Sequence, residues 1–178
     1  MEAFGRIDVL INNAGEESPY EISQYPFDEF FNMEPDEYIS FFKVHTLGHY
    51  LMMQEVINQY MREAGFGRIV NVASETGLDE AYSSPAYSSS KSAAICQTKS
   101  FAKKYGKYNI TVNSIAPGVI NTPMRASTLS EDLTSVTKMT PMGRVTEPMD
   151  VARLAMFLSQ EHLFVSGQNI IIDGGSTA

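Results

Sequence analysis

The sequence predicts an α/β fold in which helices flank a parallel sheet on both faces. Four short runs rich in Ile and Val mostly lack apolar–polar alternation, as do parallel strands that are buried on both faces. Long stretches with helix signals separate these runs, and strands that alternate with helices indicate βαβ units. The 178 residues are an ordinary length for one domain, 1–178, which can bury its own core.

The elements follow one another along the whole chain. A helix is predicted from Pro35, because proline suits the first helical position, to about Ala64, before Gly65. A second helix spans about 84–105, and a third runs from near Pro148 to about residue 159. The predicted strands are Ile7–Asn12, Arg68–Val72, Ile110–Ile115 and Asn169–Ile172.

Two connections, 16–34 and 119–145, interrupt this rhythm. Both exceed the roughly 15 residues that compact domains usually allow without a function. Each follows the carboxyl end of a predicted strand, where open α/β sheets bind their ligands. We expect the second connection to be a substrate lid, whereas for the first a surface insertion is an equal alternative.

Charge and composition exclude several classes of function. Acidic residues outnumber basic ones by 21 to 13, for a net charge of −8, which argues against nucleic acid or an anionic membrane as the main partner. The single cysteine, Cys96, excludes an internal disulfide and fits a reducing compartment. The start has no signal-like region, and no run of about 18 apolar residues occurs. We therefore expect a cytoplasmic protein, without a metal site, that binds a small molecule.

Tyr87 and Lys91 are the first candidates for chemistry, because positions i and i+4 share one face of a helix. A free tyrosine titrates at about pH 10, and a nearby ammonium lowers its pKa toward the neutral range. By itself the pair is more typical of a solvated helix face. Ser74 directly follows a predicted strand, where its hydroxyl could hold a substrate oxygen or simply cap a turn.

Together with the turn motifs that end the strands, these residues resemble the short-chain dehydrogenase/reductase family from about Phe4 to Gly175. The resemblance implies a Rossmann-like domain and the NAD- or NADP-dependent interconversion of ketones and secondary alcohols. The matching elements, in fixed order, are Asn12-Asn13-Ala14-Gly15, Ser74 with Tyr87-Ser-Ser-Ser-Lys91, Pro117-Gly118 with Thr122, and Gly167 followed by Asp173-Gly174-Gly175.

The resemblance also implies a role for each matching position. Tyr87 corresponds to the general acid/base, Lys91 to the group that lowers its pKa and binds the nicotinamide ribose, and Ser74 to the residue that positions the substrate oxygen. Besides Tyr87 and Lys91, the positions that line the cofactor are Asn12, Ala14, Gly15, Pro117, Gly118, Ile120 and Thr122, the last near the carboxamide.

One site residue departs from the family pattern. The family's usual Asn on the first long helix, where a proton relay passes, corresponds to His45. A neutral imidazole can also bridge water, so His45 could carry an altered relay. The equal alternative is a packed helix residue with no relay.

The chain matches only the C-terminal two-thirds of such a domain. No glycine-rich turn that would bind a pyrophosphate at a helix N-terminus precedes the first predicted strand. The preceding βαβαβ unit would pair with Ile7–Asn12, which we expect to be an unpaired edge. A fragment, a mis-started reading frame or one product of a split gene would explain this. NAD and NADP are not distinguished, because the ribose-reading residue belongs to that unit, and no motif identifies the substrate.

The sequence is therefore compatible with two functions. The first is an oxidoreductase that acts on a small carbonyl or alcohol by a Tyr-Lys-Ser mechanism. The second is a non-catalytic homologue that binds or assembles. In both, the helices 35–64 and 84–105 would mediate homo-oligomerisation. The expected interface residues on the second helix are Ala93, Ala94, Gln97, Phe101 and Tyr105.

Overall fold

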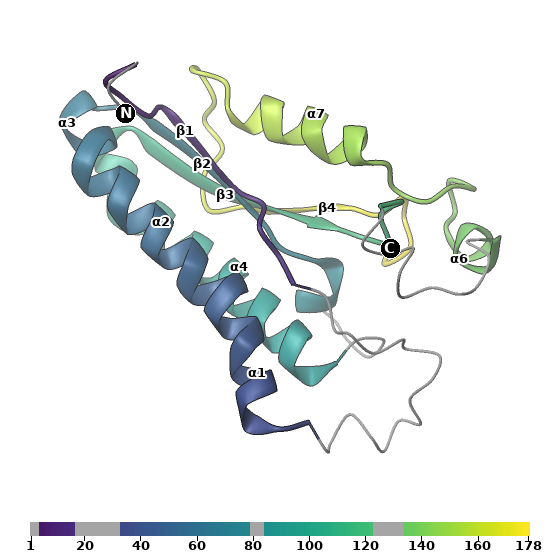
Figure 1. The fold of residues 1–178 in the computed structure, drawn as a ribbon. Helices are drawn as coiled ribbons and strands as arrows, with labels where there is room; N and C mark the ends of the chain where they lie inside the picture. Colours follow the sequence, from purple (N-terminus) through teal and green to yellow (C-terminus); the bar gives the residue numbers. More distant parts are fainter. Residues whose placement is uncertain (1–3, 17–32, 79–83, 123–133) are drawn as a thin grey trace.

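The computed structural model describes residues 4–16, 33–78, 84–122 and 134–178 (Figure 1). Its strands form one parallel sheet in the order β1-β2-β3-β4, which confirms the predicted α/β class. Relative to the predicted strands, β1 begins at Val9 instead of Ile7, and β3 continues to Pro117. The strands are β1 (Val9–Asn12), β2 (Gly67–Val72), β3 (Ile110–Pro117) and β4 (Asn169–Ile172).

The first predicted helix is one continuous helical rod with two π-helical stretches that the sequence did not reveal. Gly65 ends the rod in a left-handed conformation, with φ of 61°. π-Helical turns inside α-helices frequently mark functional sites. In chain order the segments are α1 (Pro35–Phe42), η2 (Lys43–Gly48), α2 (His49–Val56), η3 (Ile57–Met61) and α3 (Arg62–Ala64).

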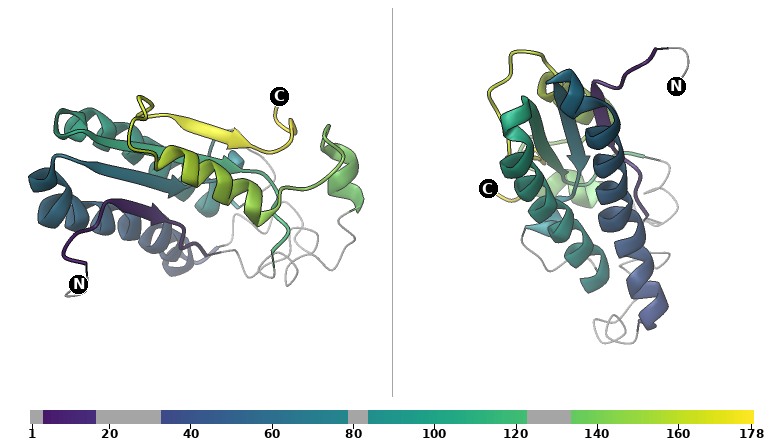
Figure 2. Two further views of the ribbon diagram at one scale, coloured as in Figure 1. Left: turned by 90° about the horizontal axis from the view of Figure 1, so that it is seen from above. Right: turned by 90° about the vertical axis from the view of Figure 1, so that its left-hand side faces the viewer.

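The other helices complete a three-layer arrangement (Figure 2). Helix α4 (Pro85–Tyr105) lies beside the rod on one face of the sheet, and α7 (Pro148–Leu158) covers the opposite face. Ser84 caps α4, because its Oγ accepts a hydrogen bond of 3.2 Å from the Tyr87 N–H. No helix in the described ranges is long and apolar enough to cross a bilayer.

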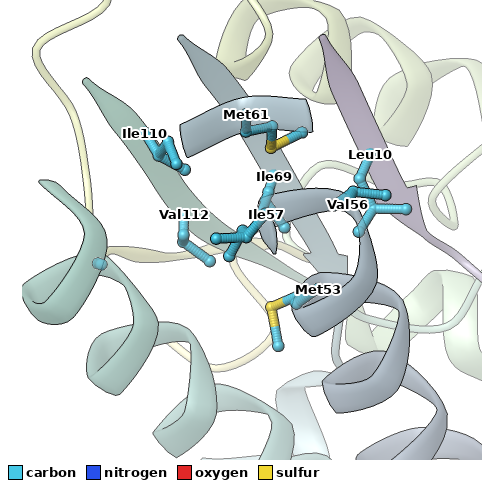
Figure 3. Close-up of a cluster of buried hydrophobic side chains, with 9 residues drawn as sticks. Leu10, Met53, Val56, Ile57, Met61, Ile69, Ile110 and Val112 are labelled. Atoms are coloured by element: carbon cyan, nitrogen blue, oxygen red, sulfur yellow. The ribbon is translucent and has the colours of Figure 1, made fainter. Parts of the chain in front are cut away.

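The core explains why the strands lack alternation. On one face, Ile69 packs with side chains of α2 and η3 such as Met53 and Ile57 (Figure 3). On the other face, the next residue, Val70, packs with Leu158 of α7. Both sides of β2 are therefore apolar, as expected for a covered parallel strand.

Strand β1 lies at the edge of the sheet, as expected, and only one of its faces is covered. Leu10 is buried under the helical rod, whereas Val9 and Ile11, which point to the opposite face, are 39% and 47% exposed. An uncovered apolar edge is a site for pairing with a further strand.

The structure describes parts of the two long connections, 16–34 and 119–145. Most of 16–34 lies outside the described residues, as does 123–133. The described end of the second connection contains a short helix that was not predicted, α6 (Thr134–Met139). The expectation that Ala94 faces a partner is wrong, because Ala94 lies on the side of α4 that packs against the rest of the chain and is fully buried.

Candidate active site

The candidate site lies at the carboxyl edge of the sheet, where parallel strands end together. Strand β1 leads into the turn 12–16, β2 leads into Ser74, and β3 leads into the segment 117–122. The first turns of α4 bring Tyr87 and Lys91 to this edge, and the π-helical stretch η2 supplies His45. Most of the predicted site residues thus reach one region by way of five separate elements.

Lys91 is a buried cation beside an aromatic ring. It is 4% exposed, its Nζ donates a 3.1 Å hydrogen bond to the Val72 carbonyl, and Nζ lies 5.6 Å from the centroid of the Tyr87 ring. Burial lowers the pKa of Lys91 from 10.5 to about 8. The rings of Phe41 and His45 meet Tyr87 edge-on, with centroids 6.2 and 5.3 Å away. The Tyr87 ring is thus packed against Phe41 and His45, beside the Lys91 ammonium.

Ser74 combines a cap with a free donor. Its Oγ accepts hydrogen bonds from the Thr76 N–H at 3.3 Å and from the Thr76 hydroxyl at 3.0 Å, so the capping interpretation is present in the structure. Because both bonds are accepted, the Ser74 hydroxyl still carries a proton that it can donate.

Gly77 holds the Ser74 turn, η4 (Glu75–Gly77), against helix α4. A Cβ at this position would lie 2.9 Å from the carbonyl carbon of Lys91, so only glycine permits this approach. The Ser92 hydroxyl donates a 2.5 Å hydrogen bond to the Gly77 carbonyl. The spacing between Ser74 and the Tyr87–Lys91 face depends on this contact.

Both ring nitrogens of the buried His45 have partners. Nε2 accepts a 2.8 Å hydrogen bond from the Glu16 N–H, and Nδ1 lies 2.9 Å from the Ser90 Oγ. Because a backbone N–H can only donate, the ring proton is assigned to Nδ1. Burial, and then the charges of Lys91 and His49, lower the pKa of His45 to about 3, so the ring is neutral. These contacts favour the packed-residue interpretation over a water relay.

The residues that follow β1 divide into two roles. Asn12 is buried and points into the layer between sheet and helices, where its Nδ2 donates to Asn71 Oδ1 at 2.8 Å. Gly15 lies at the site itself, since a Cβ there would be 3.5 Å from His45 Nε2 and 3.7 Å from Lys91 Nζ. The Ala14 carbonyl oxygen lies 3.5 Å from His49 Nε2.

The segment after β3 forms a second wall of the edge. Pro117 pairs with Ile172, and Ile120 forms a parallel bridge with Thr146, so 117–122 is held by its neighbours. Gly118 lies against the turn that follows Ser74, because a Cβ there would be 2.8 Å from Glu75 Oε2. Thr122 is half-buried at the last described position of this segment.

Two residues of the candidate site, His49 and Gly77, were not identified from the sequence. His49 stands four residues after His45, a spacing that places both on one helix face. Gly77 stands three residues after Ser74, in the turn that the Ser74 hydroxyl caps. Neither spacing identifies a site residue by itself, because the groups that His49 and Gly77 contact come from other parts of the chain.

The described residues fit one end of a nicotinamide cofactor better than the other. A buried cation, a phenol and an open glycine backbone suit a ribose and its base. For the pyrophosphate, a glycine-rich turn that opens a helix is needed. Helices α1, α4 and α7 each begin with proline instead. Across the described ranges, no group of three His, Cys, Asp or Glu could hold a metal ion.

Comparison with known proteins identifies relatives of this chain. The family model described as Enoyl-(Acyl carrier protein) reductase matches residues 1–177. The 3-oxoacyl-(acyl-carrier-protein) reductase of Thermotoga maritima is 36% identical and covers 98% of this chain and 68% of its own length. Cyclopentanol dehydrogenase of Comamonas testosteroni is 38% identical, covering 97% of this chain and 67% of its own.

A solved structure extends the likeness to the fold. The gluconate 5-dehydrogenase of Burkholderia cenocepacia, in complex with NADP and tartrate, matches with a TM-score of 0.87 at 28% identity, over 99% of this chain and 67% of that one. This chain therefore spans about two thirds of the length of these relatives. Nearly all of it matches proteins named as dehydrogenases and reductases, and it belongs to the short-chain dehydrogenase/reductase family.

Proposed function

We propose that this chain carries the proton-transfer site of an NAD- or NADP-dependent oxidoreductase that interconverts a small ketone and a secondary alcohol. The observation that supports this most is the burial of Lys91 beside Tyr87. Burying a cation is costly, and a lysine with only a structural role on a helix would extend into water. A buried cation next to a phenol is instead suited to general acid/base chemistry.

Each residue has a distinct task in the proposed mechanism. Tyr87 exchanges its phenolic proton with the substrate oxygen, and the Lys91 ammonium stabilises the phenolate that results. The Ser74 hydroxyl donates to the same substrate oxygen and stabilises its developing negative charge. When bound, the nicotinamide supplies or accepts the hydride. Lys91 has three N–H donors, so it can bind Val72 and still donate to a ribose hydroxyl.

The remaining predicted residues would line or support the cofactor. Ala14 and Gly15 border the ribose side, and Pro117, Gly118, Ile120 and Thr122 border the opposite wall. Asn12 would act through its buried bond to Asn71 by fixing the strand end beneath them. A homo-oligomer through the helical rod and α4, and a cytoplasmic location, remain predictions.

Titration of the chain with NADH and with NADPH, followed by fluorescence, tests the proposal. We expect binding of at least one nucleotide, together with oxidation of cyclopentanol or reduction of a 3-oxoacyl-(acyl-carrier-protein), the substrate classes named in the relatives above. Tyr87→Phe should lower turnover by about 100-fold or more and leave nucleotide affinity within about threefold. Tyr105→Phe, at the other end of α4, is the matched control and should be neutral.

Lys91→Met tests the second role. Without the ammonium, the pH at which oxidation becomes efficient should rise, because the phenolate is less stable. An unchanged pH–rate profile contradicts the role of Lys91. Failure of both nucleotides to bind favours a non-catalytic homologue, or a chain that needs the preceding βαβαβ unit to bind the pyrophosphate.

A further inference from the structure

We propose that His45 and His49 are a pair of positioning residues that hold the two peptide groups on either side of Gly15 against the turn of α4 that carries Tyr87 and Lys91. The inference rests on the proposed function, which places Gly15 beside the reacting groups. It concerns His45, the one site residue that departs from the family pattern, and His49, which lies four residues further along the same helical rod.

His45 holds the peptide group that follows Gly15. Its Nε2 accepts the Glu16 N–H at 2.8 Å, and its Nδ1–H faces the Ser90 Oγ at 2.9 Å. The Ser90 hydroxyl in turn donates to the Tyr87 carbonyl at 2.7 Å. In this series of hydrogen bonds every donor therefore points the same way, from the Glu16 amide to the Tyr87 carbonyl of α4.

His49 faces the peptide group that precedes Gly15. Its Nε2 lies 3.5 Å from the Ala14 carbonyl oxygen, a long contact in which the ring nitrogen must donate. The opposite nitrogen, Nδ1, is buried and has no hydrogen-bond partner among the described residues. The two histidines therefore use opposite tautomers: His45 accepts an N–H and His49 donates to a C=O.

Burial keeps both rings neutral beside the buried cation. Burial, and then Lys91, lower the pKa of His49 to about 4, in parallel with His45. Among these three residues, Lys91, with a pKa of about 8, is the one that carries a positive charge at neutral pH. Neutral rings can hold the turn through directed hydrogen bonds without adding positive charge near Tyr87.

As a result, the backbone of Gly15 lies close to the Lys91 ammonium. A side chain at this position would contact both His45 and Lys91, whereas glycine leaves that space open. Thr46 strengthens the link, because its hydroxyl donates to the Ser90 carbonyl at 3.1 Å. The π-helical stretch η2 thus holds the turn after β1 and helix α4 in one unit.

Two substitutions of similar polarity separate the bonds of His45. In His45→Gln the longer side chain can place its amide oxygen near the position of Nε2 and accept from Glu16. In His45→Asn the side chain reaches only the position of Nδ1, so the Ser90 contact can persist and the Glu16 bond is lost. Hydrogen exchange at the Glu16 amide, NADH and NADPH affinity, and kcat and KM for cyclopentanol are then measured.

We expect His45→Asn to accelerate exchange of the Glu16 amide roughly tenfold, the equivalent of one lost hydrogen bond. It should lower kcat by a similar factor with a smaller change in KM, and His45→Gln should restore both to within about threefold. His49→Leu should lower kcat by only about twofold, because the contact between His49 and the Ala14 carbonyl is long. The pH profile of kcat should keep its shape in all three variants, since neither ring titrates near neutrality.

The outcomes separate this inference from the proposed function. If the wild type turns over cyclopentanol but Glu16 exchange is the same in all variants, the positioning role is overturned and the function stands. If neither nucleotide binds but Glu16 exchange responds as expected, the proposed function is unsupported for this chain and the positioning role of His45 stands. The ¹⁵N shifts of wild-type His45 give a test that needs no variant: a proton on Nε2, or a charged ring at pH 6, overturns the proposal.

Discussion

The Nζ of Lys91 lies 3.1 Å from the carbonyl oxygen of Val72, the last residue of β2. This bond joins the second turn of α4 to the carboxyl end of an inner strand of the sheet. It fixes the ammonium at the depth of the sheet edge instead of at the helix surface. The position of the cation therefore depends on the packing of α4 against β2.

Substitution of Lys91 should reveal the cost of its burial. The pKa of Lys91 falls from 10.5 in water to about 8 in the fold, so between these values the unfolded chain binds more protons and stability rises with pH. The loss of folding stability caused by burying the charged Lys91 is fully present below pH 8 and has disappeared by pH 10.5. We expect the stability advantage of Lys91→Met over wild type to shrink by on the order of 3 kcal/mol from pH 7 to pH 10.

Urea unfolding at several pH values measures this difference. Lys99→Met, on the exposed side of the same helix, is the control and should show no such trend. A Lys91→Met difference that is constant with pH would show that the native pKa of Lys91 is not shifted.

Gly77→Ala should damage the site more than the fold. The new methyl group would lie 2.9 Å from the backbone of Lys91, so η4 and α4 must move apart and Ser74 with them. We expect kcat to fall by about tenfold or more, with a loss of stability of about 1–3 kcal/mol from overpacking. Gly106→Ala provides the comparison, because a Cβ there meets nothing within 4 Å. Equal kinetics in the two variants would refute the role of Gly77.

The buried Asn71 should be among the most sensitive positions for stability. Its Oδ1 accepts from Asn12 at 2.8 Å and its Nδ2 donates to Thr98 Oγ1 at 2.9 Å, so it links β1, β2 and α4. Asn71→Leu leaves the buried amide of Asn12 unpaired, and we expect a loss of about 2–4 kcal/mol in urea unfolding. Thr98→Val removes one of these two Asn71 bonds, together with the bond from the Thr98 hydroxyl to the Ala94 carbonyl within α4, and should cost about half as much. The reverse order would contradict a network centred on Asn71.

Arg68 should stabilise the fold without contributing to chemistry, because it lies at the amino end of β2, away from the site. The guanidinium is buried and donates to the carbonyls of Gly67, Asn109, Gln160 and Glu161. It also stacks on the Phe66 ring at 4.3 Å.

Lysine cannot satisfy four carbonyls in this planar arrangement, so Arg68→Lys should lower the free energy of unfolding by about 2–4 kcal/mol. At temperatures where the variant is folded, kcat should be unchanged. A loss of kcat comparable to that of Gly77→Ala would show that this end of the sheet communicates with the site.

The sequence by itself determined the order of the elements and most of the residues at the site. Runs of Ile and Val mark the strands, Pro35 and Pro148 begin helices where prolines are tolerated, and Gly65 ends the first one. The spacing of Tyr87 and Lys91 places them on one helix face, and the carboxyl ends of parallel strands bring the turns of β1, β2 and β3 to the same edge. These properties are local or follow from the strand direction, so they can be predicted from one sequence.

Only the tertiary structure decided how those residues are used. The burial of Lys91, the inward direction of Asn12 and the partners of His45 depend on groups that are between 19 and 59 residues apart in sequence. The tautomer of a histidine is set by what its other nitrogen meets, and the pKa of a lysine by how much water it loses. Neither quantity has a sequence period, because both arise from contacts between elements and not from the order of residues within one.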